Sequence, residues 1–184
     1  MKITSLLIAA ILVLGIFLAS GCIETGPLTK GETPTETEAP AKTPTELELK
    51  IGETAKTSVL EVTVLSAERK EGYVSMIVPE YPMAQAPSPG NIFLFVEAEI
   101  KNIGNDKVFV GSSDFSAMDS EGMRYDPEIY SESDALEMFK ELYKNQKTKG
   151  KLLFEIPKGA TGLEVLYDFG NLFIGTKLAK WEIE

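Results

Sequence analysis

The residue with the most specific chemistry in this sequence of 184 residues is Cys22, its only cysteine. It follows an apolar run from Ile3 to Ala19 and the small residues Ser20 and Gly21. A short basic start, an apolar middle and small residues at the end are typical of a secretory signal segment. A lone cysteine cannot form an internal disulfide, and there is no second thiol for a zinc or iron–sulfur site.

The stretch Leu18-Ala19-Ser20-Gly21-Cys22 resembles the lipobox of prokaryotic membrane lipoproteins. The resemblance implies cleavage between Gly21 and Cys22, with Cys22 lipidated as the first mature residue. The apolar run, about 17 residues long, is also at the short edge of a membrane-spanning helix, so an uncleaved anchor is one alternative. An ordinary secreted form is another. We expect a lipid-anchored protein on the extracytoplasmic face of the cell membrane of a bacterium or archaeon.

Composition excludes several classes of function. The net charge of -10 argues against binding to nucleic acid, which depends on lysine and arginine. The absence of histidine removes Ser-His and Cys-His catalytic pairs and every His-ligated metal site. There is also no nucleophile elbow, Gly-rich phosphate loop or Ser-x-x-Lys motif. We therefore expect no enzymatic activity and no cofactor, with an envelope glycan hydrolase as the weakest alternative.

Three segments follow from the pattern along the chain. Residues 1–21 form the signal, and residues 22–46 contain the lipidated Cys22 and a tether rich in Thr, Pro and Glu. This tether has too little apolar material to offset the entropy of ordering, so we expect it to be disordered. Because proline favours extended conformations, its 24 residues after Cys22 could reach about 70 Å at ~3.1 Å each. Residues 47–184 form the domain.

Alternating side chains predict strands through most of this domain. The clearest run lies over residues 91–102, with one face of aliphatic residues and an opposite face that is apolar only at its start. Other strands are expected in residues 58–70, 107–111, 150–168 and 176–184. Residues 114–127 predict a hairpin that turns at Asp119-Ser120-Glu121-Gly122.

One stretch departs from this alternation. Leu136, Phe139, Leu142 and Tyr143 recur at helical spacing and predict a short helix near residues 131–144. About seven short strands with regular turns indicate an all-β, two-sheet sandwich of the immunoglobulin type. A small barrel is the alternative.

The segment order from Leu47 resembles an uncharacterised family of extracytoplasmic immunoglobulin-like domains found in prokaryotic lipoproteins. The matching stretches are IGETAKTSVLEVTVLSAER, FVEAEIKNIGND, DFSAMDSEGMRYDPE and KGKLLFEIPKGATGLEVLYD. The resemblance implies a fold similar to that of the immunoprotective extracellular antigen family, and it implies no catalytic residue. It also marks residues 71–91 as longer than usual for this position.

This long loop is the candidate binding segment. Tyr73, Met76, Tyr81 and Met83 make it more apolar than a plain surface loop, and tyrosine and methionine are favoured at recognition surfaces. We expect a protein or envelope partner to bind here. The alternative is that residues 76–78 extend a strand while Tyr81 and Met83 cover one end of the sandwich.

Metal binding is a weaker hypothesis. Asp114, Asp119, Glu121 and Asp126 could supply oxygen ligands to Ca²⁺, but their spacing does not match an EF-hand loop, and turn formation explains them better. Thioethers could bind Cu(I), although core packing is the simpler role. The methionines concerned are Met76, Met83, Met118, Met123 and Met138.

The sequence therefore predicts a membrane-anchored, non-catalytic domain that binds a protein, an envelope polymer or a solute. The first alternative is an accessory subunit that shapes a transporter or envelope enzyme without a ligand of its own.

Overall fold

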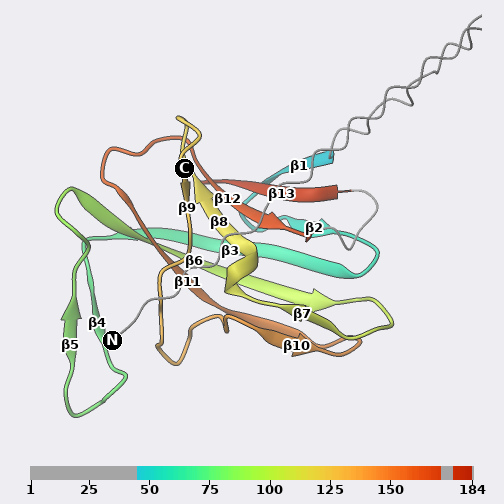
Figure 1. The fold of residues 1–184 in the computed structure, drawn as a ribbon, viewed down its shortest axis with the longest axis horizontal. Helices are drawn as coiled ribbons and strands as arrows, with labels where there is room; N and C mark the ends of the chain where they lie inside the picture. Colours follow the sequence, from blue (N-terminus) through green and yellow to red (C-terminus); the bar gives the residue numbers. More distant parts are fainter. Residues whose placement is uncertain (1–44, 171–175, 184) are drawn as a thin grey trace, which may run out of the picture. The chain divides into compact units, whose positions relative to one another are not determined.

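The computed structural model describes residues 45–170 and 176–183, which form a β-sandwich (Figure 1). The expected signal 1–21, the cleavage position at Gly21 and Cys22, and almost all of the expected tether 22–46 lie outside the described residues. The first strand begins at Thr45, just before the domain boundary expected at Leu47. Within residues 45–170 and 176–183, no helix is long and apolar enough to cross a membrane.

One layer of the sandwich is a sheet of five strands in the order β1-β13-β12-β8-β9. Strand β1 lies parallel to β13, and the other neighbours are antiparallel. The strands are β1 (Thr45–Lys50), β8 (Phe115–Met118), β9 (Arg124–Tyr125), β12 (Leu163–Asp168) and β13 (Thr176–Ile183). The turn between β8 and β9 is the predicted one, with Gly122 at a φ of 81°, which glycine adopts without strain.

The other layer is a sheet of four strands in the order β11-β6-β3-β2, all antiparallel. Its strands are β2 (Thr54–Lys56), β3 (Leu60–Lys70), β6 (Asn91–Asn102) and β11 (Lys147–Pro157). The predicted alternation of β6 is confirmed, because its aliphatic face is turned inward. The two sheets have separate hydrogen-bond ladders, which fits a sandwich and not a barrel.

The core lies between these sheets. Trp181 is fully buried, and its ring N–H donates a hydrogen bond to the carbonyl oxygen of Glu53 at 2.9 Å. This bond satisfies the one polar atom of a large buried side chain. The other large buried side chains come from both sheets: Leu94, Ile100, Leu152, Phe154, Ile156, Leu163 and Tyr167.

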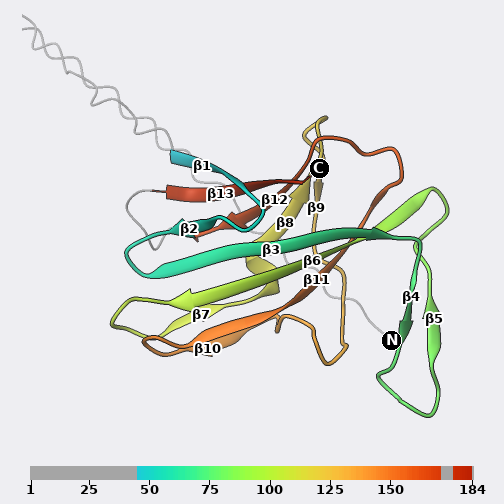
Figure 2. The same ribbon diagram turned by 180° about the vertical axis from the view of Figure 1, so that it is seen from behind.

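Two small ribbons complete the described fold, each of two antiparallel strands. The first is the β4–β5 hairpin, with β4 at Tyr73–Ser75 and β5 at Met83–Gln85. The second is the β7–β10 ribbon, with β7 at Val108–Val110 and β10 at Lys140–Leu142. A 3-10 turn, η1 (Ser112–Asp114), follows β7. Figures 1 and 2 show the hairpin projecting at one end of the sandwich, and β1 beginning at the other end, where the β7–β10 ribbon lies.

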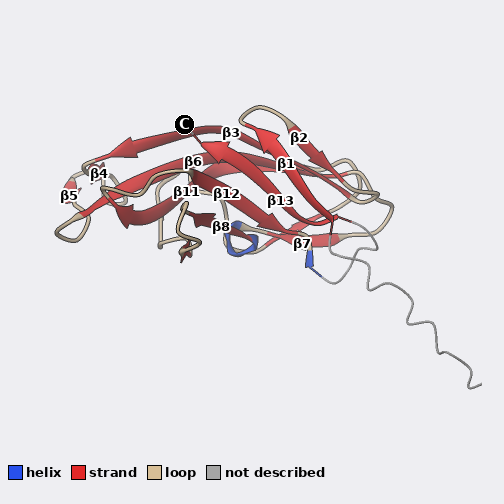
Figure 3. Ribbon diagram, turned by 90° about the horizontal axis from the view of Figure 1, so that it is seen from above, coloured by secondary structure: helices blue, strands red, loops and turns tan. Residues whose placement is uncertain are grey.

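The helix expected near residues 131–144 does not form, and this prediction was wrong. The segment makes a turn at residues 132–135 and then leads into β10, and the backbone N–H of Leu136 donates to the carbonyl oxygen of Lys151 in β11 at 2.8 Å. Gly150 allows this approach, since a Cβ there would lie 2.5 Å from the backbone nitrogen of Leu136. Pairing with β11 and β7 satisfies the backbone better than a local helix, which overrides the helical spacing. Figure 3 shows strands through most of the described chain.

Candidate interaction surface

The long segment predicted as the binding loop forms the β4–β5 hairpin. Its strands pair Tyr73 with Gln85 and Ser75 with Met83. Gly72 lies at the base, where a Cβ would be only 2.6 Å from the carbonyl oxygen of Gln85. The two strands therefore approach more closely at this point than a larger residue would allow.

An aromatic cluster attaches the hairpin to the sheet. The ring of Tyr73 lies 5.7 Å from Phe93, 5.5 Å from Phe95 and 5.5 Å from Tyr130, measured between centroids. Phe93 and Phe95 are on the outward face of β6 and are 6% and 8% exposed. These contacts explain why the outward face of β6 is apolar only where the strand begins: the hairpin covers it there.

A carboxylate fixes the hairpin on its other side. Oε2 of Glu132 accepts a hydrogen bond from the backbone N–H of Met76 at 3.0 Å. Burial raises the pKa of Tyr73 above its ordinary value, and the charge of Glu132 raises it further. Tyr130 donates to Asp134 at 2.9 Å, and burial together with this bond raises the pKa of Tyr130. The hairpin is thus held by packing at Tyr73 and by a polar contact just past the end of β4.

The rest of the hairpin presents apolar side chains to solvent. Tyr81 is 74% exposed, and the other exposed side chains are Val74, Met76, Ile77, Val78 and Met83. The structure therefore divides the predicted set, with Tyr73 packed inward and Met76, Tyr81 and Met83 facing outward. It does not fit the alternative in which residues 76–78 extend a strand and Tyr81 and Met83 cover the sandwich, because β4 ends at Ser75.

Two of the four acidic candidates for calcium, Asp119 and Asp114, have their carboxylates in other contacts. Asp119 accepts hydrogen bonds from the backbone N–H groups of Glu121 and Met123 and from the hydroxyl of Tyr125, and the Tyr125 bond lowers its pKa most. Asp114 accepts from the N–H of Gly111, and burial raises its pKa. Within the part of the chain that the structure describes, no three acidic, histidine or cysteine residues are grouped so that they could hold a metal.

The methionines considered for copper come from several elements. Met76 and Met83 belong to the hairpin, whereas Met118 is in β8. Met123 and Met138 precede β9 and β10, and both are exposed.

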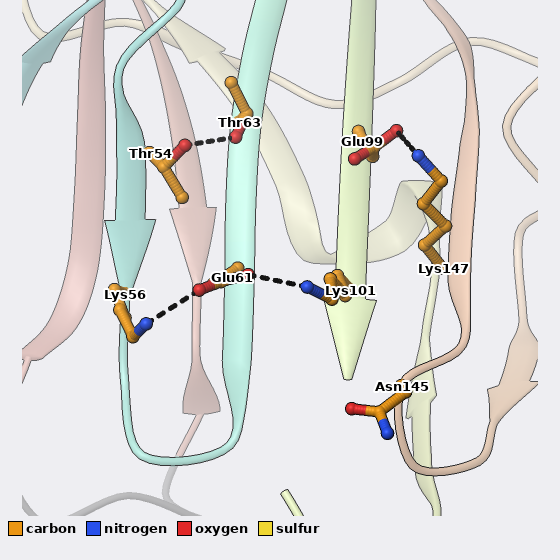
Figure 4. Close-up of a pocket in the computed structure, with 8 residues that line it drawn as sticks. All are labelled: Thr54, Lys56, Glu61, Thr63, Glu99, Lys101, Asn145 and Lys147. Carbon is orange, nitrogen blue, oxygen red and sulfur yellow. Dashed lines mark hydrogen bonds and ion pairs between the residues drawn. The ribbon is translucent and has the colours of Figure 1, made fainter. Parts of the chain in front are cut away.

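A polar pocket on the outer face of the four-stranded sheet contains three lysines that contact two glutamates (Figure 4). Glu61 contacts Lys56 at 2.8 Å and Lys101 at 3.5 Å, and the hydrogen bond from Lys56 contributes most to lowering its pKa. Glu99 pairs with Lys147 at 2.9 Å. The three lysines face two carboxylates, with Glu61 shared between Lys56 and Lys101, so the pocket keeps one positive charge in excess.

Residues 49–178 match the family model described as a domain of unknown function, DUF4352. The chain belongs to this family. The match spans both sheets of the sandwich and includes both ribbons. No curated protein matches the chain.

Solved structures share the fold of this DUF4352 domain. A secreted protein of Mycobacterium tuberculosis, MPT63, is 17% identical with a TM-score of 0.56, and the alignment covers 78% of this chain and 100% of MPT63. A candidate lipoprotein of Bacillus subtilis, ycdA, is 18% identical with a TM-score of 0.55, covering 71% of this chain and 38% of ycdA. An uncharacterised β-sandwich protein of Clostridium difficile 630 is 14% identical with a TM-score of 0.51, covering 80% and 100%. At these identities the likeness shows the fold alone.

Sequence reasoning missed a second exposed surface of the DUF4352 domain. Phe109, Phe139 and Tyr143 on and beside the β7–β10 ribbon are 66%, 71% and 55% exposed. The predicted helix concealed this surface, because it assigned Phe139 and Tyr143 to a buried helical face. The stretch Phe139-Lys140-Glu141-Leu142-Tyr143 does not alternate between apolar and polar residues, so the sequence contained no strand signal for this surface.

Proposed function

We propose that this protein is an extracytoplasmic lipoprotein, anchored through Cys22, whose non-catalytic DUF4352 domain binds a protein partner through the β4–β5 hairpin. The lipobox-like stretch before Cys22 supports the anchor. The fold is shared with a candidate lipoprotein and a secreted protein, which agrees with a position outside the cytoplasm. Cleavage, lipidation and the binding role are part of the proposal.

The exposure of the hairpin is the observation that carries the binding role. Its outward side chains include Ile77 at 62%, Tyr81 at 74% and Met83 at 62% exposure. Exposed apolar residues gathered on one projecting element are typical of an interaction site, whereas single ones are not. Burying these side chains against a partner would recover the hydrophobic free energy that solvent exposure forfeits.

The attachment of the hairpin favours binding. Tyr73 holds the base of the hairpin, and the hydrogen bond from Met76 to Glu132 holds it just past the end of β4. A surface that is ordered before binding loses less conformational entropy when the partner docks. The proposal therefore separates two roles, with Tyr73 positioning the hairpin while Tyr81 and Met83 contact the partner.

Intact mass of the detergent-extracted native protein tests the anchor. We expect a chain that begins at Cys22 and carries additional lipid mass. An unmodified chain that begins at Met1 would show that residues 3–19 remain as an uncleaved anchor. A chain cleaved without added lipid would show a freely secreted protein.

Photo-crosslinking in native membranes tests the binding surface. A photoreactive residue at position 81 should give a discrete protein adduct, whereas the same residue at the exposed position 121 should not. Tyr81→Ala combined with Met83→Ala should weaken partner binding about tenfold or more, as expected for central apolar contacts. The folding of this variant should be unchanged. An equal loss of thermal stability and binding would instead identify these residues as part of the fold.

A further inference from the structure

The β7–β10 ribbon has one buried face and one exposed aromatic face. Val110 and Leu142 are 2% and 1% exposed and pack into the core. Phe109 lies directly opposite Glu141 in the ladder. Because side chains alternate along a strand, Phe109 and Glu141 share the side turned away from the core. We call the outward side of the ribbon, with Phe139 and Tyr143 at its ends, the aromatic face.

Lysines border the aromatic face. Nζ of Lys107 lies 5.6 Å from the ring centroid of Phe109 and 2.8 Å from a carboxylate oxygen of Glu141. Nζ of Lys144 donates to the side-chain oxygen of Asn105 at 2.8 Å. Among the ion pairs of the described residues, none includes Lys144. This lysine therefore keeps a positive charge that its amide partner does not neutralise.

The position of the ribbon connects it with the start of the described chain. Strand β1 begins at Thr45 at the end of the sandwich where the ribbon lies, and the β4–β5 hairpin projects at the opposite end (Figures 1 and 2). The 44 residues that precede β1, with Cys22 among them, therefore join the domain at the aromatic end.

We propose that the aromatic face of the β7–β10 ribbon rests on the headgroup region of the membrane to which the chain is anchored. This inference depends on the lipid anchor of the proposed function. Tyrosine and lysine are favoured at a membrane surface, where the phenol lies at headgroup depth and lysine amines reach the lipid phosphates, and phenylalanine buries apolar area at the headgroup boundary. Phe109, Phe139 and Tyr143 supply the rings, and Lys144 supplies the cation.

The anchor makes a weak surface contact sufficient. A tethered domain meets the membrane at a high effective concentration, so even modest burial of three rings holds it there. The opposite end is less suited to this contact. Its hairpin has no lysine or arginine between Tyr73 and Gln85, so it offers no cation to the lipid phosphates. The membrane would therefore leave the hairpin free for its partner.

Quenching of a fluorophore by spin-labelled lipid headgroups tests the inference. The native lipidated chain is reconstituted into vesicles of equal phosphatidylcholine and phosphatidylglycerol that carry a spin label on the headgroup. Lipidation occupies the Cys22 thiol, so Asn105→Cys or Glu80→Cys provides the one free thiol for a fluorophore. We expect the fluorophore at position 105 to be quenched about twofold or more relative to position 80. The triple variant Phe109→Ser, Phe139→Ser and Tyr143→Ser should remove this difference.

The control variant is Ile129→Ser, which removes an apolar side chain that is 81% exposed and outside the ribbon; it should keep the difference. Equal quenching at both positions, or stronger quenching at position 80, overturns the inference while the lipid mass leaves the anchor intact. If intact mass shows a chain cleaved without added lipid, the anchor fails and that chain is sedimented with the vesicles. Sedimentation that the triple variant abolishes then supports the face, and its absence overturns it.

Discussion

The two small ribbons of this domain are both pairs of short antiparallel strands, but they pack on different hydrophobic clusters. The β4–β5 hairpin lies on a small separate cluster of Phe93, Phe95 and Leu153. The buried face of the β7–β10 ribbon belongs to the main core through Val110 and Leu142. A ribbon at the edge of the sandwich can therefore either pack outside the main core or contribute side chains to it. Substitutions in the hairpin should therefore have little effect on the free energy of unfolding of the whole domain. Substitutions that disturb the β7–β10 ribbon should lower it.

The largest expected effect is that of Gly111→Ala, beside the β7–β10 ribbon. A Cβ at Gly111 would lie 1.8 Å from the carbonyl oxygen of Met138, so the two segments would have to separate. Because this movement disturbs the main core, we expect the free energy of unfolding to fall by about 3 kcal/mol or more. Chemical denaturation measures it.

The matched control is Gly159→Ala, where a Cβ would meet nothing within 4 Å. It should change the free energy of unfolding by less than about 0.5 kcal/mol. Equal losses for the two variants would show that the effect comes from removing a glycine, not from the contact with Met138.

The next effect is a local one, on the hairpin. Tyr73→Ala removes three ring contacts, each worth about 0.5–1.5 kcal/mol beyond the area buried. We expect amide exchange of residues 73–85 to become fast while β6 and β11 keep their protection. Gly72→Ala should act in the same direction. Tyr81→Ala, on the exposed side, should leave exchange unchanged, and cooperative unfolding of the whole sandwich in Tyr73→Ala would contradict the comparison.

The smallest effect is a difference in pH response. Burial raises the pKa of Tyr73 above 10.0, so the folded hairpin favours the neutral ring. Its stabilisation is present below pH 10.0 and is lost as the pH rises through the raised pKa. The hydrogen bond from Lys107 lowers the pKa of Glu141 below 4.5, so the contribution of this pair is lost as the pH falls through the lowered value.

Two single variants measure this difference. Tyr73→Phe should delay the alkaline release of the hairpin, followed by a fluorophore at position 83. Glu141→Gln should reduce the small loss of stability of the β7–β10 ribbon that occurs as the pH falls. If Tyr73→Phe leaves the alkaline transition unchanged, another group controls it.

Much of the fold could be predicted from the sequence, because one face of each long strand is buried. The alternation in β3, β6 and β11 records that burial directly, and the turn at Gly122 follows from its residue types. The segment near Leu136 could not be predicted in this way. Its conformation depends on Gly150, which is adjacent in space but distant in sequence, and local spacing contains no record of that contact.

The candidate site could be predicted only in part, because contacts between residues distant in sequence leave no local pattern. Composition alone indicated the apolar segment around Tyr81 and Met83, and both are exposed. The inward position of Tyr73 depends on Tyr130, which comes from a different part of the chain. The aromatic face of Phe109 and Phe139 also required the pairing of β7 with β10, since neither stretch is unusual by itself.

The parallel pairing of β1 with β13 determines how the domain would respond to force. The register runs from Glu46 opposite Leu178 to Lys50 opposite Glu182, at the edge of the five-stranded sheet. The preceding chain joins at Thr45, so tension from that side pulls along the axis of β1. With the far end held, β1 would have to slide past β13, and the ladder bonds would share the load instead of breaking one by one. Under tension between the preceding chain and a bound partner, the β1–β13 pair is therefore loaded in shear.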